Sequence, residues 1–132
     1  MAVTESQAQE RTDAPLPDLY LDCQRCDYTY IRANIGFINL VDAPDRADIH
    51  LTITDARTYG GREFTLDFRG LNRFEGLRDT LVYRSRDTES ADQERAGLVR
   101  YMRVGLVPFA ARTDAIDHLG IYYHGDTPAS RL

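Results

Sequence analysis

The most regular pattern in the chain is an alternation of apolar and polar residues between positions 49 and 69, interrupted by Tyr59-Gly60-Gly61. An alternation with a period of two predicts a strand that buries one face, and a glycine pair between two such runs predicts a tight turn. This region is therefore predicted to form a β-hairpin with one apolar and one polar face. Its apolar residues are Ile49, Leu51 and Ile53 before the turn, and Phe64, Leu66 and Phe68 after it.

A strand and a helix are predicted before the hairpin. The short apolar run Leu19–Cys23 is typical of a buried strand. From residue 26 to residue 41 the apolar residues recur at steps of three and four, which predicts an amphipathic helix. Asp22 or Gln24 is expected to begin this helix, and Pro44 to close it. The apolar stripe consists of Tyr28, Ile31, Ile35, Ile38 and Val41.

A fourth strand of the sheet and a second helix are predicted after the hairpin. Residues 79–85 continue the sheet, with Leu81 and Tyr83 pointing inward. Thr88 or Ser90 is expected to cap the second helix, and Ser90 with Gln93 has the spacing of a capping box. The helix has one apolar stripe, formed by Leu98, Tyr101, Met102 and Leu106.

These elements predict the α+β class, with the order β-α-β-β-β-α. Two helices packed on one face of a four-stranded mixed sheet would bury both stripes and form a two-layer sandwich. The first strand, helix and next strand can form a right-handed crossover, which would make that strand pair parallel. The α+β domain is expected at residues 18–112, after a flexible polar arm at 1–17. Residues 113–132 are expected to be a tail or linker that leads to or contacts a partner.

Composition removes several classes of function. The 132 residues suit one domain, and all sixteen basic residues are Arg, with a net charge of −5. A negative surface repels nucleic acid and anionic lipid, so neither is expected as a partner. The absence of Lys excludes Schiff-base and P-loop lysine chemistry. No apolar run reaches the roughly 18 residues of a membrane span, so no direct span is predicted.

Cys23 and Cys26 form a CxxC motif between the first strand and the first helix, and three interpretations apply to it. A redox dithiol needs a stabilised thiolate, but Asp22 and Asp27 flank the pair and only Arg25 favours the negative charge. A structural zinc site needs four ligands, and one CxxC supplies two. The default interpretation is a structural disulfide or a pair of unreactive thiols, and no cofactor or metal is expected.

No catalytic constellation stands out in the sequence. The acidic residues between Asp42 and Asp48 fit turns and caps around Pro44 rather than a cation site. What remains is the polar face of the predicted sheet, which is either a solvated face or a docking surface, with an exposed edge strand as a further possibility. The residues of this candidate interaction face are Thr52, Thr54, Thr65, Asp67, Arg69, Thr80 and Arg84.

Several stretches resemble an uncharacterised family of exported bacterial proteins, in which a soluble amino-terminal α+β domain precedes an outer-membrane β-barrel. The resemblance covers about residues 18–111 and brings no catalytic residues. The strand and helix order is also similar to the amino-terminal domain of TolB and to the periplasmic domain of CsgG-type secretion proteins, an analogy of topology alone. The matching stretches are Leu21–Asp27 with Tyr30-Ile-Arg32, Ala47–Thr54, Gly60–Leu66, Asp79–Tyr83, Arg95–Arg100 and Gly105–Phe109.

The resemblance implies an exported protein of the periplasm or cell surface, associated with the outer membrane. Together with the missing active site, it predicts a non-enzymatic module for protein–protein interaction or assembly. The partner would be another protein or a second copy of the chain, bound through a sheet edge, the polar sheet face or the tail. The alternative function is a thiol-disulfide or metal-binding protein that uses Cys23 and Cys26.

Overall fold

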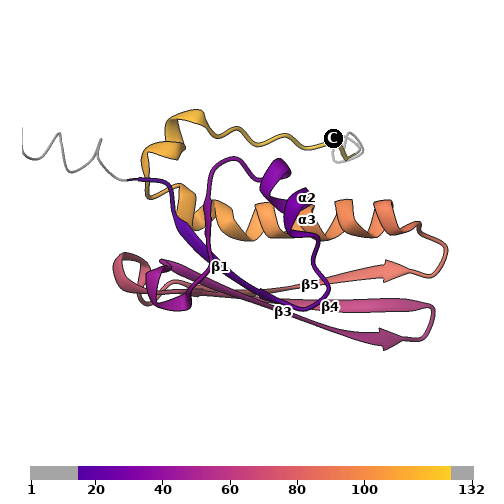
Figure 1. The fold of residues 1–132 in the computed structure, drawn as a ribbon. Coiled ribbons are helices and arrows are strands. Elements are labelled where there is room, and N and C mark those ends of the chain that lie inside the picture. Colours follow the sequence, from indigo (N-terminus) through magenta and orange to yellow (C-terminus); the bar gives the residue numbers. More distant parts are fainter. Residues whose placement is uncertain (1–14, 126–132) are drawn as a thin grey trace, which may run out of the picture.

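The structure, a computed structural model, describes residues 15–125 and has the α+β architecture, with two helices on one face of a mixed sheet (Figure 1). The helices are α2 (Tyr28–Asn34) and α3 (Ala91–Ala110). Three short 3-10 helices are η1 (Pro44–Arg46), η2 (Asn72–Phe74) and η3 (Asp114–His118). The strands are β1 (Asp18–Cys23), β2 (Asn39–Val41), β3 (Ile49–Thr58), β4 (Gly61–Gly70) and β5 (Arg78–Arg86).

The sheet has the strand order β2-β1-β3-β4-β5. β1 lies between β2 and β3 and is parallel to both, which confirms the predicted parallel pairing of the first strand with Ile49–Thr58. β4 lies between β3 and β5 and is antiparallel to both, and the three strands follow in chain order. The sheet therefore consists of a parallel part around β1 and an antiparallel meander.

The predicted first helix is wrong beyond Asn34, and so is the predicted count of four strands. The helix begins after Asp27, whose carboxylate accepts a hydrogen bond from the backbone N–H of Tyr30, rather than after Asp22 or Gln24. Asn39–Val41 then pairs with β1 as a fifth strand. The element order is consequently β-α-β-β-β-β-α. Because Ile35 and Ile38 are buried without being helical, their spacing imitated a helical stripe.

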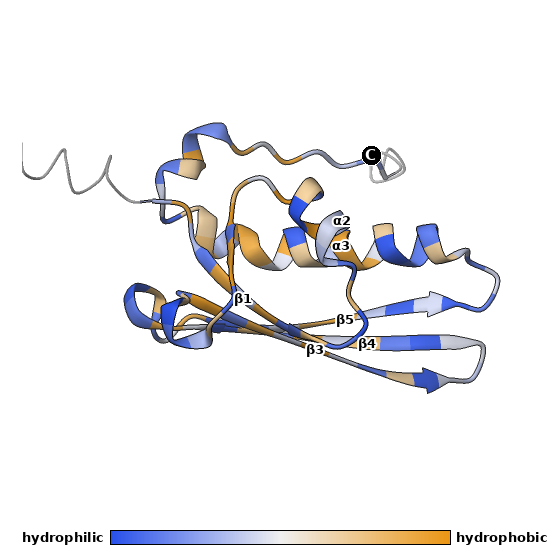
Figure 2. Cartoon of the chain, in the orientation of Figure 1, coloured by the Kyte–Doolittle hydropathy of each residue, from blue (hydrophilic) through white to orange (hydrophobic). Residues whose placement is uncertain are grey.

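The predicted hairpin is confirmed, and its strands are longer than the alternation indicated. β3 and β4 pair over ten residues each, from Ile49 opposite Gly70 to Thr58 opposite Gly61. Gly60 occupies the turn with φ of 86°, a left-handed conformation in which a glycine has no Cβ to clash. The apolar residues of both strands are buried beneath the helices. In Figure 2, hydrophobic and hydrophilic positions both occur along these strands.

α3 is the larger of the two helices and covers β4 and β5. Ser90 caps it with the complete capping box to Gln93, whereas Thr88 lies before the cap. Gly105 faces the ring of Phe68, and a Cβ at this glycine would overlap that ring. The glycine therefore allows α3 to approach the sheet closely. The fully buried side chains between the two layers include Leu19, Ile31, Ile49, Leu51, Leu66, Phe68, Val99, Met102, Leu106 and Phe109.

Both segments that flank the predicted domain have a described part. Of the predicted arm, residues 1–14 lie outside the described residues; Pro17 is buried, and the Arg73 guanidinium donates hydrogen bonds to the carbonyls of Pro15 and Leu16. Of the predicted tail, η3 lies next to α3, and its Ala115 is buried. The tail prediction for residues 126–132 likewise falls outside the described residues.

Candidate functional site

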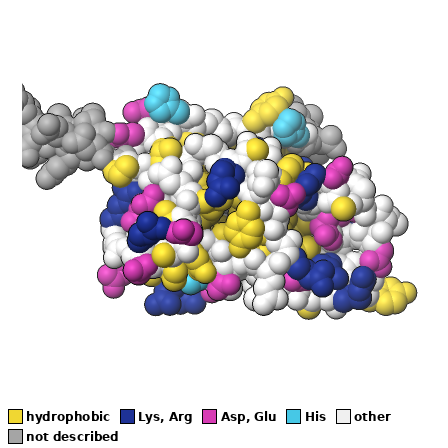
Figure 3. Space-filling model, viewed as in Figure 1, with side chains coloured by type: hydrophobic (Ala, Val, Ile, Leu, Met, Phe, Trp, Pro, Cys, Tyr) yellow, Lys and Arg dark blue, Asp and Glu magenta, His cyan; other side chains and the backbone are white. Residues whose placement is uncertain are grey.

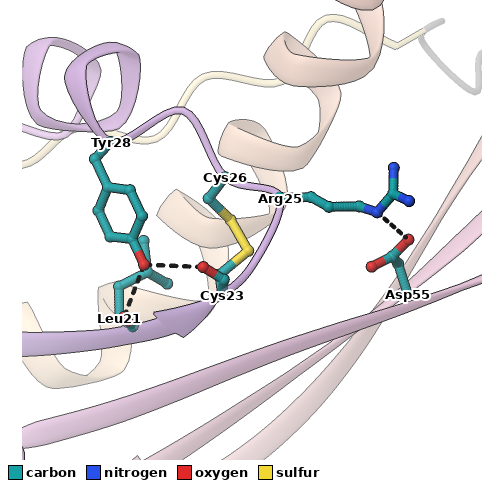
Figure 4. The surroundings of a disulfide bond; sticks show 6 residues. All are labelled: Leu21, Cys23, Arg25, Cys26, Tyr28 and Asp55. Carbon is teal, nitrogen blue, oxygen red and sulfur yellow. Dashed lines mark hydrogen bonds and ion pairs between the residues drawn. A yellow bond between two sulfur atoms is a disulfide. The ribbon is translucent and has the colours of Figure 1, made fainter.

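The two cysteines are joined by a disulfide, as the default interpretation of the CxxC allowed. Cys23 is the last residue of β1, and Cys26 directly precedes the cap of α2, so the bridge closes the turn from sheet to helix (Figure 4). Their Cα atoms lie 5.7 Å apart. The Tyr28 hydroxyl lies within hydrogen-bonding distance of the carbonyls of Leu21 (3.1 Å) and Cys23 (3.0 Å), and this holds α2 against the end of β1.

The charges around the bridge are engaged with one another. Arg25, between the cysteines, directs its Nε to the carboxylate of Asp55 at 3.6 Å (Figure 4). Arg62 lies 2.5 Å from the same carboxylate. The hydrogen bond from the Tyr30 backbone, and then the Arg95 guanidinium, lower the pKa of Asp27, which directly follows Cys26. An ionised Asp27 opposes a thiolate at Cys26, and the nearest cation is already paired, so the surroundings suit a structural bridge.

Arg95 ties the start of α2 to α3, and sequence reasoning did not identify it. Its Nη1 lies 2.7 Å from Asp27, its Nη2 lies 2.7 Å from Asp92, and its guanidinium stacks 4.2 Å from the ring centroid of Tyr30. A cavity of about 240 Å³ separates the two helices from β4 at this point, and Cys26 is among the residues that line it. Asp27 and Arg95 are 68 residues apart, so no local signal in the sequence connects them.

The described residues hold no assembled metal centre. Within residues 15–125, no group of three or more His, Cys, Asp or Glu side chains is close enough to share an ion. His50 lies on the polar face of the sheet, with its Nε2 3.6 Å from Asp22 and its ring against Tyr20. In the same part of the chain, no helix is long and apolar enough to cross a membrane.

All seven residues of the candidate interaction face lie on one side of the sheet. The two helices lie over the other side (Figure 1). Successive side chains of a strand point to opposite faces, and paired residues share a face. Thr52, Asp67 and Thr80 are paired across β3, β4 and β5 and form one row, with Thr54 and Thr65 in the next. Since the apolar neighbours on these strands face the helices, the remaining positions form a face that no described element covers.

Charge is distributed unevenly across this uncovered face. Two ion pairs link β4 to β5: Arg84 Nε lies 2.9 Å from Glu63, and Arg78 Nη2 lies 3.5 Å from Asp67. β1 contributes acidic side chains, and β5 contributes Arg78, Arg84 and Arg86. Acidic and basic side chains also lie intermixed along the side of the molecule where the strands run (Figure 3). Arginines are therefore concentrated on β5, where Arg78 and Arg84 are each paired with an acid of β4.

A second exposed region lies on the helix side, over the outer surface of α3. Val104 of α3 is 61% exposed, and Ile121 of the tail is 89% exposed. The two residues line a cavity of about 690 Å³, together with Phe37 and Tyr122. These apolar side chains form a partly open groove, and nothing in the described residues shows what covers it.

Comparison with known proteins gives no further assignment. No protein-family model matches the chain. No curated protein matches it at a significant level. Its function is therefore argued from the geometry of the sheet face, the sheet edge and the bridge.

Proposed function

We propose that this protein is a non-enzymatic interaction module of the bacterial cell envelope, which binds another protein through the open side and edge of its sheet. The observation that carries the proposal is the uncovered face, where the seven polar residues are presented together by three strands. In a fold of two layers, the helices cover one face of the sheet and leave its other face free. A face of this kind, lined by hydroxyls and charges, suits a polar protein interface.

Two side chains in the described part of the chain have shifted pKa values. The pKa of Asp27 is lowered, and the pKa of Tyr83 is raised. Burial, followed by the charge of Glu89, raises the pKa of Tyr83, and its ring faces the helices. Neither Asp27 nor Tyr83 lies on the uncovered face.

Localisation in the periplasm or at the cell surface is part of the proposal. A disulfide forms and persists in oxidising compartments, which include the bacterial periplasm and cell surfaces. The Cys23–Cys26 bridge and the resemblance to exported proteins support this placement.

The test places a photo-reactive residue at Thr65, in the middle of the uncovered face, and for comparison at Arg103, which is exposed on α3. Irradiation of cells that export the protein is expected to give one discrete adduct from Thr65 that is absent from Arg103. The charge reversal Asp67→Arg should abolish the adduct if the face makes the contact. Adducts of equal yield at both positions, or an adduct indifferent to Asp67→Arg, would overturn the proposal. Sedimentation across a concentration range then distinguishes a second copy from a different protein.

A second candidate function is a thiol-disulfide or metal-binding protein, favoured by one observation, the position of Cys26 in the wall of the 240 Å³ cavity. The variant Cys23→Ser/Cys26→Ser separates the two functions. If it loses reduction of a model disulfide substrate, or loses zinc binding by the reduced protein, while the Thr65 adduct remains, the thiol function is supported. If it keeps the adduct and the wild-type protein shows neither activity, the thiol function is excluded.

A further inference from the structure

β5 is an edge strand, and half of its backbone groups point away from the sheet. Just outside the paired region, Gly70 N–H bonds to Leu77 O, and Asp87 N–H bonds to Gly60 O. In an antiparallel pair, hydrogen-bonded residues alternate with non-bonded ones. The odd-numbered residues of β5 therefore bond to β4, and the even-numbered residues direct their N–H and C=O groups to the free edge. The outward-pointing residues are Arg78, Thr80, Val82, Arg84 and Arg86.

Two of these outward N–H groups are already occupied by side chains of the same chain. The Asp79 carboxylate accepts from Thr80 N–H at 2.8 Å, and the Glu89 carboxylate accepts from Arg86 N–H at 3.0 Å. Such local capping is one way in which a protein limits indiscriminate pairing at a sheet edge. The caps leave the N–H groups of Val82 and Arg84 open between them, where a partner strand can accept hydrogen bonds.

The same even-numbered residues place arginine side chains on the uncovered face beside this gap. Arg78, Arg84 and Arg86 form a row of arginines, the basic stripe, along the edge of a protein whose net charge is −5. Arg78 and Arg84 each pair with one acid of β4, but their side chains remain 64% and 71% exposed towards the free edge. Opposite charges that face each other across two strands are stabilising, and like charges are destabilising. The charge of the stripe therefore selects a strand with acidic side chains at alternate positions.

The stripe also disfavours pairing of β5 with a second copy of itself. A two-fold antiparallel pair centred on Val82 would place Arg78 of one copy opposite Arg86 of the other, and the reverse at the other end. Both ends would then carry like charges directly opposite each other. The opposite edge of the sheet is β2, which has three residues. It is too short to pair along the length of β5 in a second copy.

We infer that β5 binds an extended acidic segment of a different protein, which adds to the sheet as a sixth strand. The inference rests on the proposed function and names the partner chemistry of its sheet edge. Antiparallel addition is assigned because this pairing is the stronger one per residue and continues the β3–β4–β5 meander.

The test uses a fluorescent peptide of nine residues, the length of β5, and the full chain. Valine is the central residue of the peptide. On each side of it threonine comes first and then alternates with glutamate, so that the glutamates face the arginine stripe. Methylation of the backbone amide nitrogens of glutamate and valine removes the N–H groups that face β5. It should weaken binding, measured by fluorescence anisotropy, by about tenfold or more. Methylation of the threonine amides, which face away, is the matched control and should leave binding unchanged. A lysine-for-glutamate peptide should not bind.

Val82→Pro provides the complementary test on the protein. It removes an outward N–H that the β4 ladder does not use, and proline is tolerated at such edge positions. The variant is expected to keep its circular dichroism and lose peptide binding by about tenfold or more, whereas Val82→Ala keeps binding. If Val82→Pro does not fold, the binding of the methylated peptides to the wild-type protein is the deciding test.

The results separate this inference from the proposed function. Equal binding of the two methylated peptides, no binding of the unmodified peptide, or equal binding of the lysine peptide overturns acidic strand addition at β5. If the Thr65 adduct persists in that case, the interaction function stands without it. If acidic peptide binding follows the expected pattern while the adduct is missing, the edge functions independently of the sheet face.

Discussion

The guanidinium of Arg95 lies 2.7 Å from the carboxylate of Asp27, so the side chain that caps α2 is also held by α3. The disulfide lies in the turn that leads from β1 into α2. The contact holds this turn against α3, a helix that lies far from it in the sequence. Both residues remain partly exposed, and the contribution of the pair therefore depends on pH and salt.

Asp27→Asn is expected to make the protein less stable at neutral pH and to change its response to acid. Asparagine can still cap the helix, so the substitution mainly removes the charge. Because the folded-state pKa of Asp27 is lowered, its stabilisation is fully present above the ordinary value of 3.8 and is lost as the pH falls through the folded-state pKa. Melting temperatures of the two proteins should converge as the pH is lowered.

Asp92→Asn is the control for this prediction, since Asp92 also pairs with Arg95 but caps no helix in the same way. Its effect on the melting temperature should be smaller. A difference between Asp27→Asn and the wild-type protein that stays constant down to about pH 2 would contradict ionisation of Asp27 as the cause.

Gly105→Ala is expected to destabilise the protein although alanine is the better helix former. The added methyl group would overlap the Phe68 ring, which is fully buried and has no free space to move into. Overpacking of this kind costs about 1–3 kcal/mol, against a gain in helix propensity of about 1 kcal/mol. Urea unfolding measures the net loss. Gly36→Ala, where a Cβ meets no atom within 4 Å, should show no such loss.

Ser90→Ala should lower the free energy of unfolding by about 1 kcal/mol, because it removes the acceptor of the Gln93 N–H at the start of α3. Thr88→Ala is the matched control, since Thr88 precedes the cap and contributes no capping bond to α3. Equal losses in the two variants would show that the capping box does not contribute in solution.

Cys23→Ser/Cys26→Ser is expected to fold and to lose about 2 kcal/mol or less. The bridge spans a sequence separation of three, and closure of so short a loop restrains the unfolded chain only modestly. Leu51→Ala, in the middle of the core, should cost more, about 2–5 kcal/mol. A double serine variant that is less stable than Leu51→Ala would mean that the bridge contributes more to folding than chain entropy allows.

The hairpin and the uncovered face could be predicted because their signals are local. Alternation fixes the face on which each residue of a strand lies, so Thr52 and Thr65 were assigned to the polar side without knowledge of the tertiary fold. The capping box at Ser90 has the same local character. In such segments the sequence and the long-range packing favour the same conformation.

The parts that escaped prediction depend on distant partners. Asn39–Val41 is a strand because β1 offers it a free edge, and a three-residue strand has no periodicity of its own. The ion pair of Arg95 and the outward backbone groups of β5 follow from packing and register. The sequence shows which residues occupy these positions, but it does not show which of them contact one another.

β1 is the first strand in residues 15–125 and yet occupies the interior of the sheet, which has a consequence for the order of folding. The β3–β4–β5 meander pairs neighbouring segments, and hairpins form within about 1–10 μs. Pairing of β1 with β3 must close a loop that contains α2 and β2, at a larger cost in entropy. Until β1 inserts, β2 and the meander are separate pieces. We therefore expect insertion of β1 to be the step that makes folding cooperative across the sheet.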